Sequence, residues 1–186
     1  SPIAMSLDNG EVWGEKAKLS GTSRKSVDRM VSSPFYRANE LRDHYNEVTL
    51  RFKKDWNVEF RAYDDGIVYR FVSRAKKPFN VLDEIVDYQF PFDAVASVPY
   101  VNRGKDGDYE SQFFNSFENT YVTNNLSKQN KKRLMFLPLV VEAGDGVKIC
   151  ITESDLENYP GLFLSAAKGE NRLSGKFAPY PKRTVQ

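Results

Sequence analysis

Carboxylates offer the clearest chemistry in this 186-residue chain, and they gather in the stretch DGDYE from Asp106 to Glu110. Oxygen-bearing side chains alternate there, as they do at the start of a calcium-binding loop. However, Ser111 stands where such a loop needs its sharp-turn glycine, and Phe117 stands where it needs a bidentate glutamate. The helix-loop-helix calcium site is therefore excluded. A looser oxygen site that uses Glu110 or Glu118 stays open beside the alternative of an acidic surface loop.

Other reactive residue types do not form a recognisable catalytic set. Two carboxylates at a fixed separation would suit glycosidic cleavage, but their pairing cannot be read from the sequence. His44 is the only histidine and Cys150 the only cysteine, which excludes an internal disulfide, a cysteine metal cluster and a histidine-rich zinc site. His44 is interpreted as a hydrogen-bonded structural residue at the start of a strand.

The charge balance also narrows the range of partners. The chain carries 27 basic and 25 acidic residues, a formal net charge of +2, with the two signs mixed along the sequence. This argues against a nucleic-acid partner or a membrane partner that binds by electrostatic attraction. No apolar stretch approaches the roughly 20 residues that span a bilayer. With 40% hydrophobic and 13% aromatic residues, the chain is expected to build a core.

Alternation of apolar and polar residues predicts the β-strands that must position these groups. In the range 47–74, residues such as Val48 and Phe52 recur with the period of two that is typical of a strand. The turn DDG, which ends at Gly66, is predicted to join two strands in a hairpin through a positive φ angle. A second hairpin is predicted around the GDG of residues 144–146. Further strands are expected in VLDEIVDYQF, SVPYV, TYVTNN and GLFLSAA.

Helices are expected to be nearly absent. The segment from Ser33 to His44 could form a short helix with Pro34 at its first position, although its apolar residues do not make a full stripe. We therefore predict an all-β fold, an antiparallel β-sandwich without an internal domain boundary. The sandwich is expected to fill residues 1–176, and residues 177–186, which include two prolines, are expected to be a linker.

Three stretches, taken in order, carry a family resemblance: VWGE at residues 12–15, RDHYNEVTLRF followed by VEFRAYDDGIVYRF, and VKICITESDLENYPGLFLS. Together they are similar to the amino-terminal domain of glycoside hydrolase family 97, the bacterial family of α-glucosidases and α-galactosidases. The resemblance implies a β-supersandwich of the galactose-mutarotase-like kind. In that family the sandwich precedes a (β/α)8 barrel that carries the catalytic groups. Residues 177–186 are therefore expected to lead toward a barrel, and the first strands of the domain are expected to precede Ser1.

The resemblance also implies a calcium ligand. In the family, a glutamate of the sandwich joins barrel glutamates around a calcium ion beside the substrate. Alignment on YVTNNLS places that glutamate at Glu118, with Glu110 as the runner-up because the segment between them is variable. Since Ca²⁺ takes six to eight oxygen ligands, one carboxylate is expected to bind calcium weakly or not at all in the isolated domain.

The resemblance favours the following function. The chain is expected to be part of a calcium-dependent enzyme that acts on α-glucosides or α-galactosides, in the periplasm or secreted, with its own barrel and an oligosaccharide substrate as partners. The fragment alone is expected to be inactive. The alternative is a non-catalytic carbohydrate-binding β-sandwich, which would use exposed aromatic residues such as Trp13 or Tyr109. A third hypothesis, a purely structural protein, predicts binding of neither sugar nor calcium.

Overall fold

The computed structural model describes residues 3–167 and 171–179, and their regular structure is almost entirely β-strand. The helices in this part of the chain are two short 3-10 turns, η1 (Glu110–Gln112) and η2 (Leu126–Lys128). None is long and apolar enough to cross a membrane. The chain divides into two compact units. Unit 1 contains Ser1–Val12 and Val81–Gln186, and unit 2 contains Trp13–Asn80.

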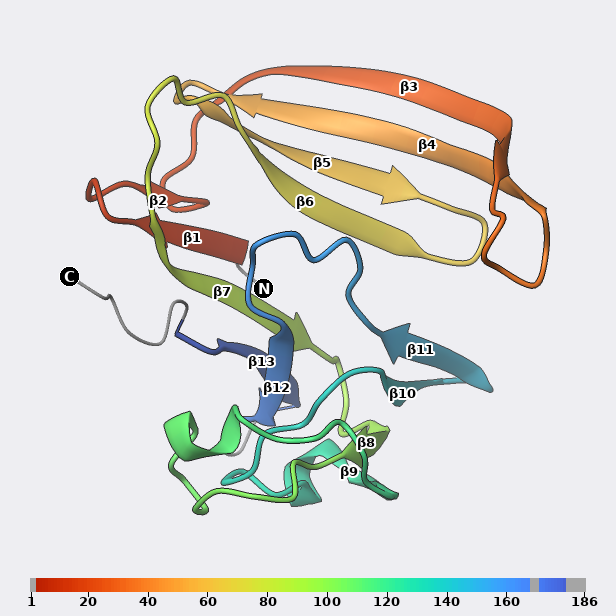
Figure 1. Cartoon of the computed structure of the whole chain (residues 1–186), viewed down its shortest axis with the longest axis vertical. Coiled ribbons are helices and arrows are strands. Elements are labelled where there is room, and N and C mark those ends of the chain that lie inside the picture. Colours follow the sequence, from red (N-terminus) through yellow and green to blue (C-terminus); the bar gives the residue numbers. More distant parts are fainter. Residues whose placement is uncertain (1–2, 168–170, 180–186) are drawn as a thin grey trace. The chain divides into compact units, whose positions relative to one another are not determined.

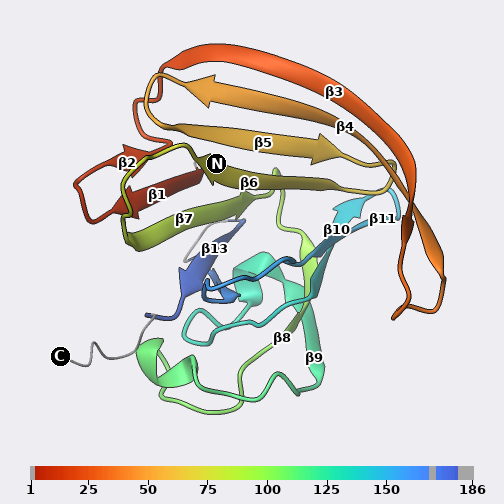
Figure 2. The same cartoon turned by 45° about the horizontal axis from the view of Figure 1, so that its top comes forward.

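Unit 2 is built on one antiparallel sheet whose strands follow the order of the chain (Figure 1). Its strands are β3 (Leu19–Ser32), β4 (Glu40–Phe52), β5 (Trp56–Ala62) and β6 (Ile67–Ser73). β3 and β4 pair along nearly their whole length, whereas β5 pairs only with the stretch of β4 from Asn46 to Arg51. The hairpin of β3 and β4 therefore extends beyond the turn between β5 and β6, as both views show (Figures 1 and 2).

Aromatic side chains fill the apolar side of unit 2. Trp13 and Trp56 are buried and stack with their ring centroids 5.9 Å apart. Phe52 stacks on Trp56 at 4.0 Å, and Phe79 meets the edge of Trp13 at 5.2 Å. Such large rings dominate the energetics of a small core, because each buries much apolar surface.

Two local predictions for unit 2 are wrong in part. The short helix allowed for Ser33 to His44 does not form, because residues 40–44 belong to β4 and pair with β3, and this ladder satisfies their backbone groups. The hairpin at DDG is confirmed, but Gly66 does not have the positive φ angle. The turn instead closes through a hydrogen bond from the Tyr63 N–H to the Gly66 carbonyl at 2.8 Å.

Unit 1 is a β-sandwich of two antiparallel sheets. The first has the order β12-β13-β7-β1-β2 and the second has the order β11-β10-β8-β9. The strands are β1 (Ile3–Leu7), β2 (Val12–Trp13), β7 (Val81–Gln89), β8 (Val95–Pro99), β9 (Tyr121–Asn125), β10 (Leu139–Gly144), β11 (Val147–Ile151), β12 (Leu162–Ala166) and β13 (Arg172–Phe177). β2 begins in unit 1 and ends in unit 2. The predicted GDG hairpin is confirmed, and its three residues all have positive φ angles.

The core of unit 1 joins its two sheets. Val98 and Val141 from one sheet lie in the same buried cluster as Leu164 and Leu173 from the other. The all-β, antiparallel fold class expected from the sequence is therefore confirmed. The sandwich lies in unit 1, however, and the chain divides into two compact units where one sandwich without an internal boundary was expected. The extent of the domain, residues 1–176, stays a prediction. Of the expected linker, Phe177 ends β13, and residues 180–186 lie outside the described part of the chain.

Candidate functional site

The connection from β8 to β9, residues 100–120, contains both predicted metal ligands and is here called the platform loop. Apart from the single turn η1 it contains no helix or strand, so side chains complement the few backbone–backbone hydrogen bonds that hold it. Gln112 is completely buried and bonds to three backbone groups, one in the loop and two in the segment that precedes β10. Its Nε2 donates to the carbonyls of Lys105 at 2.6 Å and Lys132 at 2.8 Å, and its Oε1 accepts from the Leu134 N–H at 2.8 Å.

A glycine makes room for this arrangement. Gly104 has a φ angle of +89°, and a Cβ atom there would lie 2.6 Å from both the Gln112 Cγ and the Ser111 carbonyl oxygen. A side chain at position 104 would therefore both strain the backbone and displace the loop. Gly107 has a similar φ angle of +84° but open space around it.

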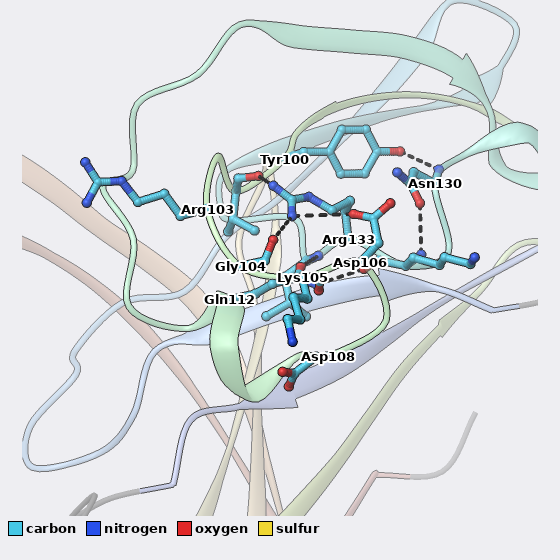
Figure 3. A network of polar contacts seen from close by, with 12 residues as sticks. Tyr100, Arg103, Gly104, Lys105, Asp106, Asp108, Gln112, Asn130 and Arg133 are labelled. Carbon is cyan, nitrogen blue, oxygen red and sulfur yellow. Dashed lines mark hydrogen bonds and ion pairs between the residues drawn. The ribbon is translucent and has the colours of Figure 1, made fainter.

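Arg133 and Tyr100 attach the platform loop to the segment that precedes β10 (Figure 3). Arg133 donates to the carbonyls of Gly104 at 2.7 Å and Val101 at 2.6 Å, and forms an ion pair with Asp106 at 3.5 Å. The Tyr100 hydroxyl accepts from the Asn130 N–H at 2.7 Å. Burial raises the pKa of Tyr100 and the bond from Asn130 lowers it, and the balance is a pKa above the ordinary value. The tyrosine therefore stays neutral as a structural hydrogen-bonding group.

Glu118 lies where the platform loop leads into β9, and the loop holds it by its backbone. The Asn102 Nδ2 donates to the Glu118 carbonyl at 2.8 Å, and the next side chain, Asn119, donates to the Tyr100 carbonyl at 2.7 Å. The Glu118 side chain itself is exposed, and its carboxylate makes no hydrogen bond or ion pair within residues 3–167 and 171–179. A fixed backbone thus presents a carboxylate that is available for a ligand.

The other acidic residues of the loop do not join Glu118 in a metal site. Glu110 is exposed at the start of η1, while Asp106 pairs with Arg133. Asp108 accepts from the Ser111 N–H at 3.3 Å and closes its own turn. Among the described residues, no group of three or more His, Cys, Asp or Glu side chains could hold a metal ion. The acidic stretch is a structured surface loop.

The two aromatic residues named for sugar binding are buried or half-buried and already contact other residues of the chain. Trp13 is only 3% exposed and packs in the core, so it does not offer the exposed ring that the carbohydrate-binding alternative requires. Tyr109 is half-buried, its hydroxyl donates to the Lys131 carbonyl at 2.9 Å, and Lys176 lies 5.9 Å from its ring centroid. His44 on β4 contacts Asp64 in the turn between β5 and β6, at 3.2 Å between Nδ1 and Oδ2.

A second acidic group in unit 1 was not recognised in the sequence. Glu84 on β7 accepts from the Tyr159 hydroxyl at 2.6 Å, and Glu153 accepts from the Leu162 N–H at 2.9 Å. Burial, reinforced by the neighbouring charges of Asp83 and Glu153, raises the pKa of Glu84. Burial likewise raises the pKa of Glu153, against the opposing effect of the bond from Leu162. Both carboxylates bond to the segment TESDLENYPGL, so their evident role is to hold that segment.

The fold and the sequence together define a class of protein. The chain belongs to the family described as Glycosyl-hydrolase 97 N-terminal, whose family model matches residues 1–186. Among characterised relatives, the "Retaining alpha-galactosidase" of Bacteroides thetaiotaomicron is 77% identical over 186 residues. The match covers 100% of this chain but 28% of that relative, so the chain spans less than a third of the relative's length.

Solved structures support the fold independently of close sequence similarity. A glycoside hydrolase family 97 enzyme from Pseudoalteromonas sp. strain K8, in complex with acarbose, matches 95% of this chain and 26% of its own with a TM-score of 0.76 at 19% identity. A beta-arabinopyranosidase crystal structure matches 97% of this chain and 30% of its own, with a TM-score of 0.79 at 18% identity. At such identities the likeness shows the fold alone, and it agrees with the predicted β-sandwich architecture.

Proposed function

We propose that this chain is the amino-terminal domain of a longer glycoside hydrolase that cleaves α-galactosides with retention, and that it braces the catalytic barrel and donates Glu118 to a calcium ion. The substrate class follows the relative that is 77% identical to the chain and is called a retaining alpha-galactosidase. α-Glucosides are the second substrate class for the longer protein. Export to the periplasm or secretion belongs to the same proposal.

The observation that carries the calcium role is the state of Glu118. Its backbone is fixed by Asn102 and Asn119, while its carboxylate is exposed and unpaired within the described residues. A carboxylate oxygen is the ligand type that Ca²⁺ prefers, and a fixed backbone lowers the entropic cost of binding. One carboxylate supplies at most two of the six to eight oxygens required. The remaining ligands therefore have to come from the rest of the longer protein.

The test compares the two candidate ligands in one protein. In a chimera, this chain replaces the matching segment of the B. thetaiotaomicron retaining α-galactosidase, and activity is titrated with calcium after chelation. Glu118→Gln keeps the shape but removes the charge, so we expect half-maximal activation to need at least about tenfold more calcium. Glu110→Gln is the matched control and should titrate like the parent chimera.

Two results would count against this assignment. If both variants require the same calcium concentration as the parent, Glu118 is not a ligand. If Glu110→Gln alone shifts the titration, the ligand is the runner-up. Circular dichroism of each variant shows whether the fold is intact.

A further inference from the structure

Exposed apolar side chains gather on both sides of Glu118. Phe114 is 55% exposed and Phe117 is 64% exposed, and both precede it in the platform loop. Tyr121 and Val122 follow it on β9, with 48% and 39% of their surfaces exposed. Single exposed apolar residues are common, but several within nine consecutive residues around one functional carboxylate mark an interaction surface.

Two of these side chains, Phe117 and Tyr121, are held in place within the chain itself. The ring of Phe117 meets the edge of Phe136 at a centroid distance of 5.7 Å and stacks on Phe163 at 5.8 Å. The Tyr121 hydroxyl donates to the Pro138 carbonyl at 2.8 Å. Rigid aromatic side chains lose little conformational entropy on binding, which is why they are frequent among the residues that dominate interface energies.

The strand that carries Tyr121 and Val122 also has an open edge. β9 is the last strand of the order β11-β10-β8-β9 and pairs with β8. Within residues 3–167 and 171–179, no strand pairs with its other side. An exposed strand edge is a site for pairing with another chain segment unless something covers it. Tyr121 and Val122 are consecutive on β9, so their side chains point to opposite faces of the sheet on either side of this edge. A single body that wraps the edge can therefore cover both.

We propose that Phe114, Phe117, Tyr121 and Val122, together with the outer edge of β9, form the surface on which the rest of the longer protein docks. This inference rests on the proposed function, since the partner is the part of the hydrolase that this chain does not contain. The relative extends over more than three times the length of this chain, which covers 28% of it. The metal geometry gives a further reason for this choice of partner. Ligands that share a Ca²⁺ ion with Glu118 lie about 2.3–2.6 Å from that ion, so the body that supplies them has to contact the residues beside Glu118.

Thiol labelling of the chimera tests this docking surface directly. In a background whose native cysteines, Cys150 included, are replaced by serine, single cysteines are introduced as Phe114→Cys and Val122→Cys. Phe35→Cys is the matched control, because Phe35 is fully exposed in the loop between β3 and β4. If the surface is covered, both test positions should react with a maleimide at least about tenfold more slowly than the control. All three should react equally in urea.

The outcomes separate docking from calcium binding. Reaction at the control rate overturns the docking surface, even where Glu118→Gln still shifts the calcium titration. Protection that persists in the Glu118→Gln background supports docking, even where the calcium assignment fails. Protection that disappears on dilution, together with a dimer in light scattering, assigns the surface to a second copy of the chain and overturns the proposal.

Discussion

The platform loop of unit 1 and the sheet of unit 2 bury a polar side chain in opposite ways. Gln112 is neutral and bonds to two backbone carbonyls and one backbone N–H. Glu47 on β4 is charged and bonds to other side chains, with Lys25 at 3.0 Å and Arg61 at 2.8 Å. The three charged residues are direct cross-strand neighbours, since Lys25 pairs with Glu47 and Glu47 pairs with Arg61.

The difference follows from where the backbone finds its partners. A sheet satisfies its own N–H and C=O groups through the ladder, so the side chains are left to pair with one another. A loop has no ladder, and a buried side chain such as Gln112 has to replace it. The arrangement around Gln112 and Gly104 should therefore depend on neutral hydrogen bonds and steric fit, whereas the charged contacts of Glu47 in unit 2 should respond to pH.

The largest effect on the free energy of unfolding is expected from Gly104→Ala, which places a methyl group where the platform loop has no room for one. The φ angle of +89° and the distance of 2.6 Å between a Cβ atom and the Ser111 carbonyl oxygen act together. We expect a loss of about 3 kcal/mol or more in the free energy of unfolding, measured by urea denaturation. Gly107→Ala shares the φ angle but meets nothing within 4 Å, so it should cost only about 1 kcal/mol. Equal losses for the two variants would show that the fit around Gly104 is not what matters.

A smaller loss is expected from Gln112→Ala. The change leaves the buried Leu134 N–H without its partner and opens a cavity, so we expect a loss of about 2–3 kcal/mol in the free energy of unfolding. Because no charge is involved, the loss should be the same at low and high salt. A loss that shrinks as salt is added would show that charges, and not neutral hydrogen bonds, hold Gln112 in place. Ser111→Ala, which removes one exposed hydroxyl of the same loop, serves as the milder control.

Many strands of both units could be predicted from the sequence, because their signal is local, but β1, β3 and β13 were not predicted. Alternation and turn residues lie within a few positions of one another. The segments VLDEIVDYQF, TYVTNN and GLFLSAA each contain a strand, and SVPYV overlaps the end of β8. Glu118 came from a resemblance and not from any local pattern. Gln112 was missed because its partner Leu134 lies 22 residues away and its type is not distinctive. The helix allowed at Ser33 failed for a related reason, since pairing with β3 decides the structure of residues 40–44.

The lowered pKa of Glu47 makes the stability of the protein depend on pH. Burial raises the pKa of Glu47, but hydrogen bonds and charges from Lys25 and Arg61 lower it by more, so it lies below its ordinary value of 4.5. The folded carboxyl therefore binds a proton less tightly than the unfolded one. Its stabilising contribution is present above pH 4.5 and is lost as the pH falls through the lower folded pKa. Glu84 behaves in the opposite sense, because its raised pKa makes the folded state gain stability as the pH falls.

Glu47→Gln should therefore have the smallest effect of the three and the clearest dependence on pH. Lys25 and Arg61 are partly exposed and can return to water, so we expect a loss of about 1 kcal/mol at neutral pH. Urea titrations from pH 7 to pH 3 should show this loss shrinking toward zero in acid, since protonation removes the same charge. Glu84→Gln is the matched change in unit 1, and its effect should run in the other direction, stabilising at neutral pH and converging on the parent in acid. A Glu47→Gln loss that stays constant across this range would mean that Glu47 acts through packing, as Gln112 does, and the contrast between the regions would fail.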